Sequence, residues 1–571
     1  MVNGIIKLKE KRRVFVIGLD GATLDLIKPW VSGGKLPCLG KILREGVCGE
    51  LRSTIHPLTP QAWASFLTGK NPGKHGIYDF IYRKKDSYDI TYQKSSSRHG
   101  ESIWKIISDT GKKVGVVNIP LNYPPEKVNG FCISWQDASG AENDYMYPRD
   151  LVNEIEREVG KYLITVEYKK KKKNVKARYL KDLEMLIDNR ALTTEYLMTH
   201  KEWDFFIVLF SATDLVQHTF WKYMDKNHPL YDEMEAKKYG DAILNIYKKV
   251  DNSIERLLKH IDDDTLLIIM SDHGAGPLYG EIRLNTWLRK NGFLFYRNRN
   301  RNLKFHYLIN IDSIVRSSWS LLRKLTSKKL RGLLKNMFPH IREKLEGTLF
   351  SSNIDWKKTA AYSLGTYGNI FVNLKGREPE GIVNSGLEYE QVRDKIICLL
   401  EALTHPQNGK RIVAKVYKRE ELYKGEFLGK APDLIVQWRD YAYHSRQRFG
   451  EESDKVFETR LFSPLSDFEI NGFHRLNGML IMKGKQIQRN MEISGANILD
   501  LAPTILYFMG IPIPDDMDGK VLLEVFDDRF SSNNKIQYRS GKKYSFDEKE
   551  AVYSQEDLKE IQKRLTELGY L

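Results

Sequence analysis

Short runs of β-branched and aromatic residues, separated by longer stretches with helical periodicity, constrain the fold of this chain more than any other feature. Runs that are apolar throughout are typical of strands in a parallel sheet, because helices cover both faces of such a sheet. The alternation of strand and helix patterns favours βα units. We therefore predict an α/β sandwich around a mostly parallel sheet, with strands in RVFVIGL, KVGVVNI, WDFFIVLF, TLLIIM, IFVNL, DLIVQW and MLIMKG.

Composition and charge limit the class of protein. With 41% hydrophobic and 29% charged residues, the chain has the balance of a globular protein. Its first apolar run, Val14 to Leu19, is too short for a signal peptide core or a membrane span. The net charge of +16 suits an anionic partner, although no nucleic-acid-binding motif accompanies it. Scattered cysteines without CxxC spacing predict reduced thiols and a cytoplasmic location (Cys38, Cys48, Cys132 and Cys398).

The strand pattern predicts a catalytic α/β domain in two parts, residues 12–282 and 348–526. Between them, residues 283–347 are basic and show helical periodicity, which predicts an inserted helical cap. The apolar stripe of this cap either packs on the main domain or rests on an anionic membrane surface. Residues 527–571 are predicted to form a polar tail with a short terminal helix. The basic run Lys169 to Lys173 fits a solvated surface or a phosphate-binding patch.

Three carboxylates follow three of the apolar runs. Asp20 follows VFVIGL, Asp214 comes shortly after FFIVLF, and Asp272 follows TLLIIM. In open α/β sheets ligands bind outside the carboxyl ends of the strands, so these acids can converge although they are far apart in sequence. Unpaired carboxylates at one place repel one another and raise each other's pKa. Their convergence therefore predicts a bound cation.

Histidines accompany two of these acids. Asp214 and His218 are four residues apart, which places both on one face of a helical turn. Asp272 and His273 are adjacent, so they can reach neighbouring ions only if SDHGAG is irregular, as its glycines permit. A later histidine, His474 in NGFHRLNG, is a further candidate. Mixed Asp and His ligands favour zinc, with manganese or iron as alternatives.

The segment HPLTPQAWASFLTG predicts a loop followed by a helix from about Gln61 to Gly69. Thr59 lies just before this helix, where free backbone N–H groups form a site for a phosphoryl group. A threonine hydroxyl is a poor nucleophile unless a divalent ion lowers its pKa. We therefore interpret Thr59 as a candidate nucleophile beside the metal ligands. His75 in GKHG is interpreted as a structural histidine.

In order and local context, these motifs resemble the alkaline phosphatase superfamily, and most closely its type I phosphodiesterase/nucleotide pyrophosphatase branch. The resemblance spans about Val14 to Asp518 and implies an alkaline-phosphatase-like three-layer sandwich. Seven separate residues fall in the family's order. The motifs that resemble those of the family are IGLDGA, LTPQAWASFLTG with NPGKHGIYDF, TDLVQH, SDHGAG and GFHR, together with YGNIFVNLKGREPEGIV, GKAPDLIVQW and LDLAPTILYFMGIPIPDDMDG.

The resemblance implies two divalent metal ions and assigns ligands to each. One ion would be bound by Asp20, Asp272 and His273, with Thr59 bridging toward it. Three more residues (Asp214, His218 and His474) would bind the other ion. Thr59 would attack phosphorus to give a phosphothreonine enzyme, which is then hydrolysed. The implied activity is hydrolysis of phosphodiester or nucleotide pyrophosphate bonds in a small phosphorylated substrate.

One position departs from the family pattern. Many members have an asparagine three residues after the threonine, where its amide helps to hold a phosphoryl oxygen. This chain has Ala62 there, so the third contact to that oxygen is unassigned. Asn477 or Arg475, near His474, could provide it.

Other functions of the same superfamily fit part of the pattern. A sulfatase requires a cysteine-derived nucleophile in CxPxR, and LPCLGK around Cys38 lacks the proline and arginine. A phosphomonoesterase or phosphomutase would use the same metal ligands, so it remains the alternative. A non-catalytic protein that binds membranes or anions through its basic insertion is a further alternative, although all the ligands and the hydroxyl are present.

Overall fold

The fold is described from a computed structural model of the chain. The structure describes residues 12–135, 145–166, 174–297, 353–445, 454–462, 469–542 and 561. Three predictions fall outside these residues: the environment of Lys169 to Lys173, the insertion from residue 298 onward with its membrane contact, and nearly all of the terminal helix.

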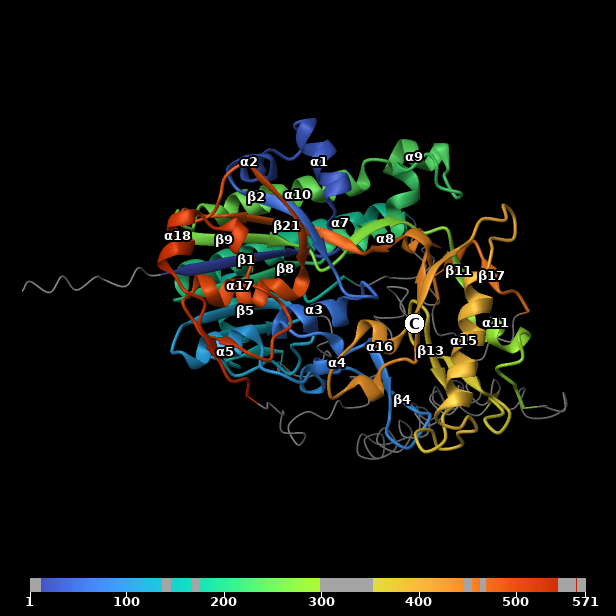
Figure 1. The fold of residues 1–571 in the computed structure, drawn as a ribbon. Helices are drawn as coiled ribbons and strands as arrows, with labels where there is room; N and C mark the ends of the chain where they lie inside the picture. Colours follow the sequence, from blue (N-terminus) through green and yellow to red (C-terminus); the bar gives the residue numbers. More distant parts are fainter. Residues whose placement is uncertain are drawn as a thin grey trace, which may run out of the picture.

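A nine-stranded sheet forms the centre of the molecule (Figure 1). Five neighbouring strands, β9, β1, β8, β5 and β6, run parallel, as do β2 and β22, whereas β21 and β7 run in the opposite direction. The predicted α/β fold with a mostly parallel sheet is therefore confirmed. In sheet order the strands are β22 (Met491–Asn497), β2 (Val47–Arg52), β21 (Asn477–Lys483), β9 (Thr265–Met270), β1 (Arg13–Leu19), β8 (Phe205–Phe210), β5 (Val114–Ile119), β6 (Gly130–Ser134) and β7 (Met146–Tyr147).

Two groups of helices cover the sheet, and Figure 1 shows them above and below strands β1 and β9. Helices within each group contact one another. Because both faces are covered, the central strands are buried along their length, and β8, β9 and β5 are buried at every residue. One group is α1 (Leu24–Ser32), α2 (Pro37–Glu45), α7 (Val175–His200), α8 (Ala212–Met224) and α10 (Ala242–Leu258); the other is α3 (Thr59–Thr68), α5 (Ile103–Asp109) and α17 (Leu501–Phe508).

A second, four-stranded sheet is antiparallel, with strand order β12-β13-β15-β14. It contains IFVNL and DLIVQW, which the sequence placed in the central sheet. The third late run, MLIMKG, does lie in the central sheet, as antiparallel β21. An apolar run predicts a buried strand but carries no signal for the sheet it joins or its direction. The elements are β12 (Ala361–Ser363), β13 (Asn369–Val372), β14 (Val413–Lys418), β15 (Leu434–Trp438) and the helix packed on them, α15 (Leu387–Glu401).

Short strands lie between the two sheets. β10 follows β9 in the chain and pairs with β20, which carries His474 opposite Ala275. Among the described residues, no helix combines the length and the apolar character needed to cross a membrane. The remaining elements are β3 (Ile81–Arg83), β4 (Ile90–Tyr92), β10 (Gly274–Pro277), β11 (Gly280–Ile282), β16 (Tyr443–His444), β17 (Phe457–Glu458), β18 (Leu461–Phe462), β19 (Glu469–Ile470), β20 (Gly472–Arg475), β23 (Ile513–Pro514), β24 (Tyr538–Arg539), α4 (Pro72–His75), α6 (Leu151–Glu158), α9 (Glu233–Tyr239), α11 (Leu284–Lys290), α16 (Arg419–Leu422) and α18 (Asp528–Asn533).

Candidate active site

Three adjacent strands of the central sheet bring the predicted carboxylates together. β9, β1 and β8 are neighbours and parallel, so their carboxyl ends lie at one edge. Asp20 directly follows β1, Asp272 follows β9, and Asp214 lies in the first turn of α8, just after β8. All three side chains are buried. The convergence expected from the strand pattern is therefore present in the structure.

One cluster consists of Asp20, Asp272 and His273, whose ligand atoms all lie within 4.8 Å of one another. His273 Nε2 is 3.5 Å from Asp20 Oδ1 and 3.4 Å from Asp272 Oδ2. Those two carboxylate oxygens are buried and accept no hydrogen bond from any described residue. Two such oxygens beside an imidazole nitrogen form a donor set that fits a divalent cation such as zinc.

A second cluster consists of Asp214, His218 and His474, with ligand atoms again within 4.8 Å of one another. His218 Nε2 is 3.1 Å from Asp214 Oδ2, and His474 Nε2 is 3.5 Å from Asp214 Oδ1. The two clusters are adjacent, because the rings of His273 and His474 stack with centroids 3.5 Å apart. The structure thus groups the six predicted ligands into the two sets that the family resemblance implies.

Backbone carbonyls orient all three histidine rings. The Nδ1 atoms of His218, His273 and His474 lie 2.9, 3.0 and 2.8 Å from the carbonyl oxygens of Gly472, Gly274 and Pro57, respectively. A carbonyl accepts only, so in each ring Nδ1 carries a proton and Nε2 is the atom that faces the neighbouring acids or a bound cation. Metal-binding histidines are commonly held in this way by a second hydrogen bond. The sequence did not indicate these carbonyls.

The electrostatics of the two clusters also indicate a missing positive charge. Burial, followed by the charges of Asp272 and Asp214, raises the pKa of Asp20 well above its ordinary value. Burial also raises the pKa of Asp272. Burial alone would raise the pKa of Asp214 too, but His218, His474 and His273 hold it below its ordinary value. No lysine or arginine among the described residues pairs with these acids, so a bound cation is the natural counter-charge.

Gly21 allows the acids to approach one another. Its φ of +64° lies in the left-handed region, which favours glycine. A Cβ atom at this position would lie 2.9 Å from Asp214 Oδ1. Gly21 also donates its N–H to Asp272 Oδ1, at 3.4 Å. The DG pair after the first strand therefore forms part of the site as well as a turn.

Thr59 lies beside the first cluster. Its Oγ1 is 3.4 Å from His273 Nε2, and the residue is 1% exposed. Thr59 is the first residue of α3, whereas the sequence predicted a helix from about Gln61. The helix begins earlier because Pro60, which lacks an N–H, is well tolerated in the first turn. The first N–H groups of a helix have no intrahelical acceptor, so they remain available to a phosphoryl oxygen.

Neither Ala62 nor its suggested replacements lies free at the site. Ala62 is fully buried in the main hydrophobic core. The guanidinium of Arg475 donates to the carbonyl oxygens of Tyr441 and Pro277, and Asn477 donates to Glu50 at the surface. His75 fits its structural interpretation, since it is buried at the end of α4 and its ring nitrogens contact Ser65 and the N–H of Ile77. None of these residues is therefore assigned to a third phosphate contact.

Sequence reasoning missed the loop between β12 and β13, which reaches the metal ligands. Tyr367 from this loop lies against His474, with ring centroids 5.9 Å apart. Asp79, in the HGIYDF motif, accepts hydrogen bonds from the N–H and hydroxyl of Thr366 in the same loop. The only sequence signal was the family-like stretch that begins at this tyrosine.

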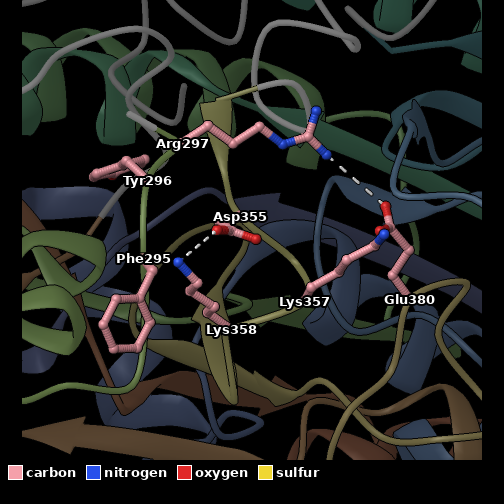
Figure 2. Close-up of a pocket in the computed structure, with 7 residues that line it drawn as sticks. All are labelled: Phe295, Tyr296, Arg297, Asp355, Lys357, Lys358 and Glu380. Carbon is pink, nitrogen blue, oxygen red and sulfur yellow. Dashed lines mark ion pairs between the residues drawn. The ribbon is translucent and has the colours of Figure 1, made fainter. Parts of the chain in front are cut away.

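A pocket of about 520 Å³ lies in a different part of the molecule (Figure 2). It contains two ion pairs, Arg297–Glu380 at 3.9 Å and Lys358–Asp355 at 3.6 Å. None of the seven predicted site residues lines it. Its lining is Phe295, Tyr296, Arg297, Asp355, Lys357, Lys358 and Glu380. Opposite charges on its walls already pair with one another, so the metal clusters remain the candidate active site.

A comparison with one solved structure shows the same fold. Phosphonoacetate hydrolase from Sinorhizobium meliloti 1021, in complex with phosphonoformate, aligns with a TM-score of 0.53 and 13% identity, over 87% of this chain and 95% of that chain. Human ectonucleotide pyrophosphatase/phosphodiesterase 5 aligns with a TM-score of 0.46 and 14% identity, over 87% of this chain and 95% of that chain. Among curated proteins, no match is found.

The family model described as type I phosphodiesterase / nucleotide pyrophosphatase matches residues 14–460, most of the chain. This range includes Thr59 and every predicted metal ligand except His474. Membership implies a divalent-metal-dependent hydrolase of phosphoric esters that acts on small phosphorylated substrates. The chain therefore belongs to the type I phosphodiesterase/nucleotide pyrophosphatase family of the alkaline phosphatase superfamily.

Proposed function

We propose that the protein hydrolyses phosphodiester or pyrophosphate bonds through a phosphothreonine intermediate on Thr59. The observation that carries this proposal is the position of the Thr59 hydroxyl, 3.4 Å from His273 Nε2 and beside both ligand clusters. The hydroxyl also lies at the start of α3, where free N–H groups can hold a phosphoryl oxygen.

Two divalent ions, zinc in the first instance, are proposed for the two clusters. Asp20, Asp272 and His273 would hold one ion, and Asp214, His218 and His474 the other. Bound ions would lower the pKa of the threonine hydroxyl and stabilise charge on the leaving oxygen. The three histidines suit this role because their Nδ1–H groups are held by carbonyls and their Nε2 atoms face the acids.

In the proposed reaction, Thr59 is the group that forms and then breaks a bond to phosphorus. The oxygen of Thr59 forms a bond to phosphorus while the bond to the leaving oxygen breaks, and that oxygen departs with the electron pair. Water then attacks the same phosphorus, the bond from phosphorus to the Thr59 oxygen breaks, and a phosphomonoester is released. The proton lost by Thr59 in the first step goes to the leaving oxygen, and a proton from water restores the Thr59 hydroxyl. Burial of the ligands strengthens each electrostatic interaction in the site.

Substitution of Thr59 tests the nucleophile. Thr59→Ala is expected to lower kcat by at least about 1,000-fold, because the attacking group is absent, while metal content and melting temperature stay unchanged. Thr68→Ala is the matched control, since Thr68 is also buried in α3 but its hydroxyl donates to the carbonyl of Ala64. Substantial turnover by Thr59→Ala would overturn the assignment.

A phosphomonoesterase or phosphomutase is the second candidate, because both would use the same ligands. The two are separated by turnover of a diester and a monoester of the same chromogenic alcohol, with zinc or manganese added. The proposed function predicts a higher kcat/KM for the diester, and a strong monoester preference would contradict it. Metal content near zero after mild purification would instead favour a non-catalytic binding protein.

We also propose a cytoplasmic location. All four cysteines are free, and burial raises the pKa of the Cys38 thiol to about 12, so this thiol is unreactive at neutral pH. Fractionation of the producing cells tests the proposal, and recovery of the protein outside the cytoplasm would contradict it.

A further inference from the structure

Tyr367 has an unusual backbone conformation close to the metal ligands. Its φ is +64°, in the left-handed region that non-glycine residues seldom adopt, and its side chain is fully buried. Because non-glycine residues seldom adopt this conformation, the surrounding structure must impose it. Such residues cluster at functional sites.

Several hydrogen bonds fix this conformation. The N–H of Tyr367 donates to the carbonyl of Ser445 at 2.7 Å, and its own carbonyl accepts from the Trp438 indole N–H. On either side of it, Asp79 accepts from the N–H of Thr366 at 2.9 Å and from the Asn369 amide at 3.1 Å. The position of the tyrosine is therefore determined from both ends of the loop.

The ring of Tyr367 lies beside the site, with its centroid 5.9 Å from that of His474. It lies 5.1 Å from the ring of Phe473 and stacks on His56 at 5.2 Å. Its hydroxyl lies 3.5 Å from the carbonyl oxygen of Pro57, which also accepts the Nδ1–H of His474. A distance of 3.5 Å is long for an O–H···O bond, so the phenol is poorly satisfied and available to a better acceptor.

The phenol is a hydrogen-bond donor by its own chemistry. A tyrosine hydroxyl has an ordinary pKa of about 10, so it is protonated at neutral pH.

Resting on the proposed function, we propose that Tyr367 is a substrate-binding residue of this site. Its phenol donates a hydrogen bond to a non-bridging oxygen of the phosphoryl group, the contact that Ala62 cannot make. A phosphoryl oxygen carries negative charge and accepts a stronger hydrogen bond than the distant Pro57 carbonyl. The ligand class is a tetrahedral oxyanion, either substrate phosphoryl or free phosphate.

Removal of the hydroxyl tests this role. The zinc-loaded full chain is compared with Tyr367→Phe for diester hydrolysis and for affinity to inorganic phosphate by calorimetry. A hydrogen bond to a charged group is worth about 10- to 100-fold, so kcat/KM and phosphate affinity are each expected to fall by about that factor. Zinc content and melting temperature are expected to stay unchanged, because the ring and its stacking remain.

Tyr441→Phe is the matched control. Tyr441 is also buried with a positive φ of +49°, and its ring lies 6.2 Å from that of Tyr367. Its hydroxyl has no hydrogen-bond partner among the described residues. This variant is expected to keep the parent's kcat/KM and phosphate affinity.

The outcomes separate this inference from the proposed function. Parent values of kcat/KM and phosphate affinity in Tyr367→Phe would overturn the role of Tyr367, and so would losses explained by lost zinc or unfolding. If Tyr367→Phe does not fold, 3-fluorotyrosine is placed at this position, because it is a stronger hydrogen-bond donor of similar shape. Phosphate affinity is then expected to rise, and unchanged affinity would overturn the role of Tyr367. Turnover by Thr59→Ala would overturn only the nucleophile. A parent that neither hydrolyses the diester nor binds phosphate would overturn both.

Discussion

At the scale of single residues, the site depends on close approach between groups from different strands. Asp20, Asp214 and Asp272 are separated by long stretches of sequence, yet Gly21 contacts the latter two. The acids and their convergence could be predicted from the sequence because each follows an apolar run. The contacts of Gly21 and Tyr367 could not, because a glycine after a strand and a tyrosine in a loop have many ordinary roles.

Gly21→Ala is predicted to weaken metal binding. A methyl group here would displace Asp214 Oδ1, so affinity for the second ion is expected to fall by about 10- to 100-fold. Gly34→Ala is the control, because Gly34 has a similar φ of +68° but no atom within 4 Å of the added carbon. Both variants should lose about 1 kcal/mol of unfolding free energy. Equal zinc affinities in the two variants, measured by competition with a chelating dye, would show that Gly21 has no special role.

At the scale of elements, the central sheet could be predicted more fully than the second sheet. Five of the seven predicted strands lie in the central sheet, and the continuous burial of β5, β8 and β9 explains their apolar character. β13 and β15 have the same local character but pair in an antiparallel sheet. Sheet membership depends on contacts between distant segments. His474 reaches the site in the same non-local way, through the pairing of β20 with β10.

Asp79, which joins the loop after α4 to the loop between β12 and β13, is predicted to make stability depend on pH. Burial raises its pKa from an ordinary 3.8 to about 6, although hydrogen bonds from Thr366 and Phe80 oppose this. The folded chain therefore keeps this proton up to about pH 6, whereas the unfolded chain loses it near pH 4. The contribution to the unfolding free energy is fully present below pH 3.8 and is lost, by up to about 3 kcal/mol, as the pH rises to about 6.

Urea unfolding of the parent and of Asp79→Asn at several pH values between 4 and 7 measures this contribution. The difference between the two unfolding free energies is expected to shift in favour of the variant as the pH rises. A constant difference across this range would contradict the raised pKa. Taking the difference between the two proteins removes the contribution of the other titrating groups.

At the scale of the whole molecule, the two ligand clusters connect most of the chain. The predicted ligands extend along the chain from Asp20, just after β1, to His474 in β20, and they lie together in the fold. The three buried carboxylates among them would repel one another without a cation. Removal of metal by a chelator is therefore predicted to lower the melting temperature. At a free zinc concentration of about 100 times Kd, the loss corresponds to about 2.7 kcal/mol for each ion.

Scanning calorimetry with and without chelator measures this effect. The double variant Asp20→Asn, Asp272→Asn is the comparison, because it has lost the repulsion and two ligands of the first ion. Its melting temperature should respond about half as much to the chelator as that of the parent, because the ligands of the second ion remain. An equal response in both proteins would place the stabilising ion elsewhere.

Covalent phosphorylation of Thr59 during turnover is the most direct test of the proposed chemistry. The zinc-loaded protein is mixed with a diester substrate, quenched in acid within the first turnovers, digested and mapped by mass spectrometry. The peptide containing Thr59 is expected to carry, on that residue, one phosphoryl group still esterified to the alcohol that did not leave, and the same peptide from Thr59→Ala is expected to carry none. Rapid diester hydrolysis without phosphorylated Thr59, or with phosphorylation at another residue, would contradict the threonine mechanism.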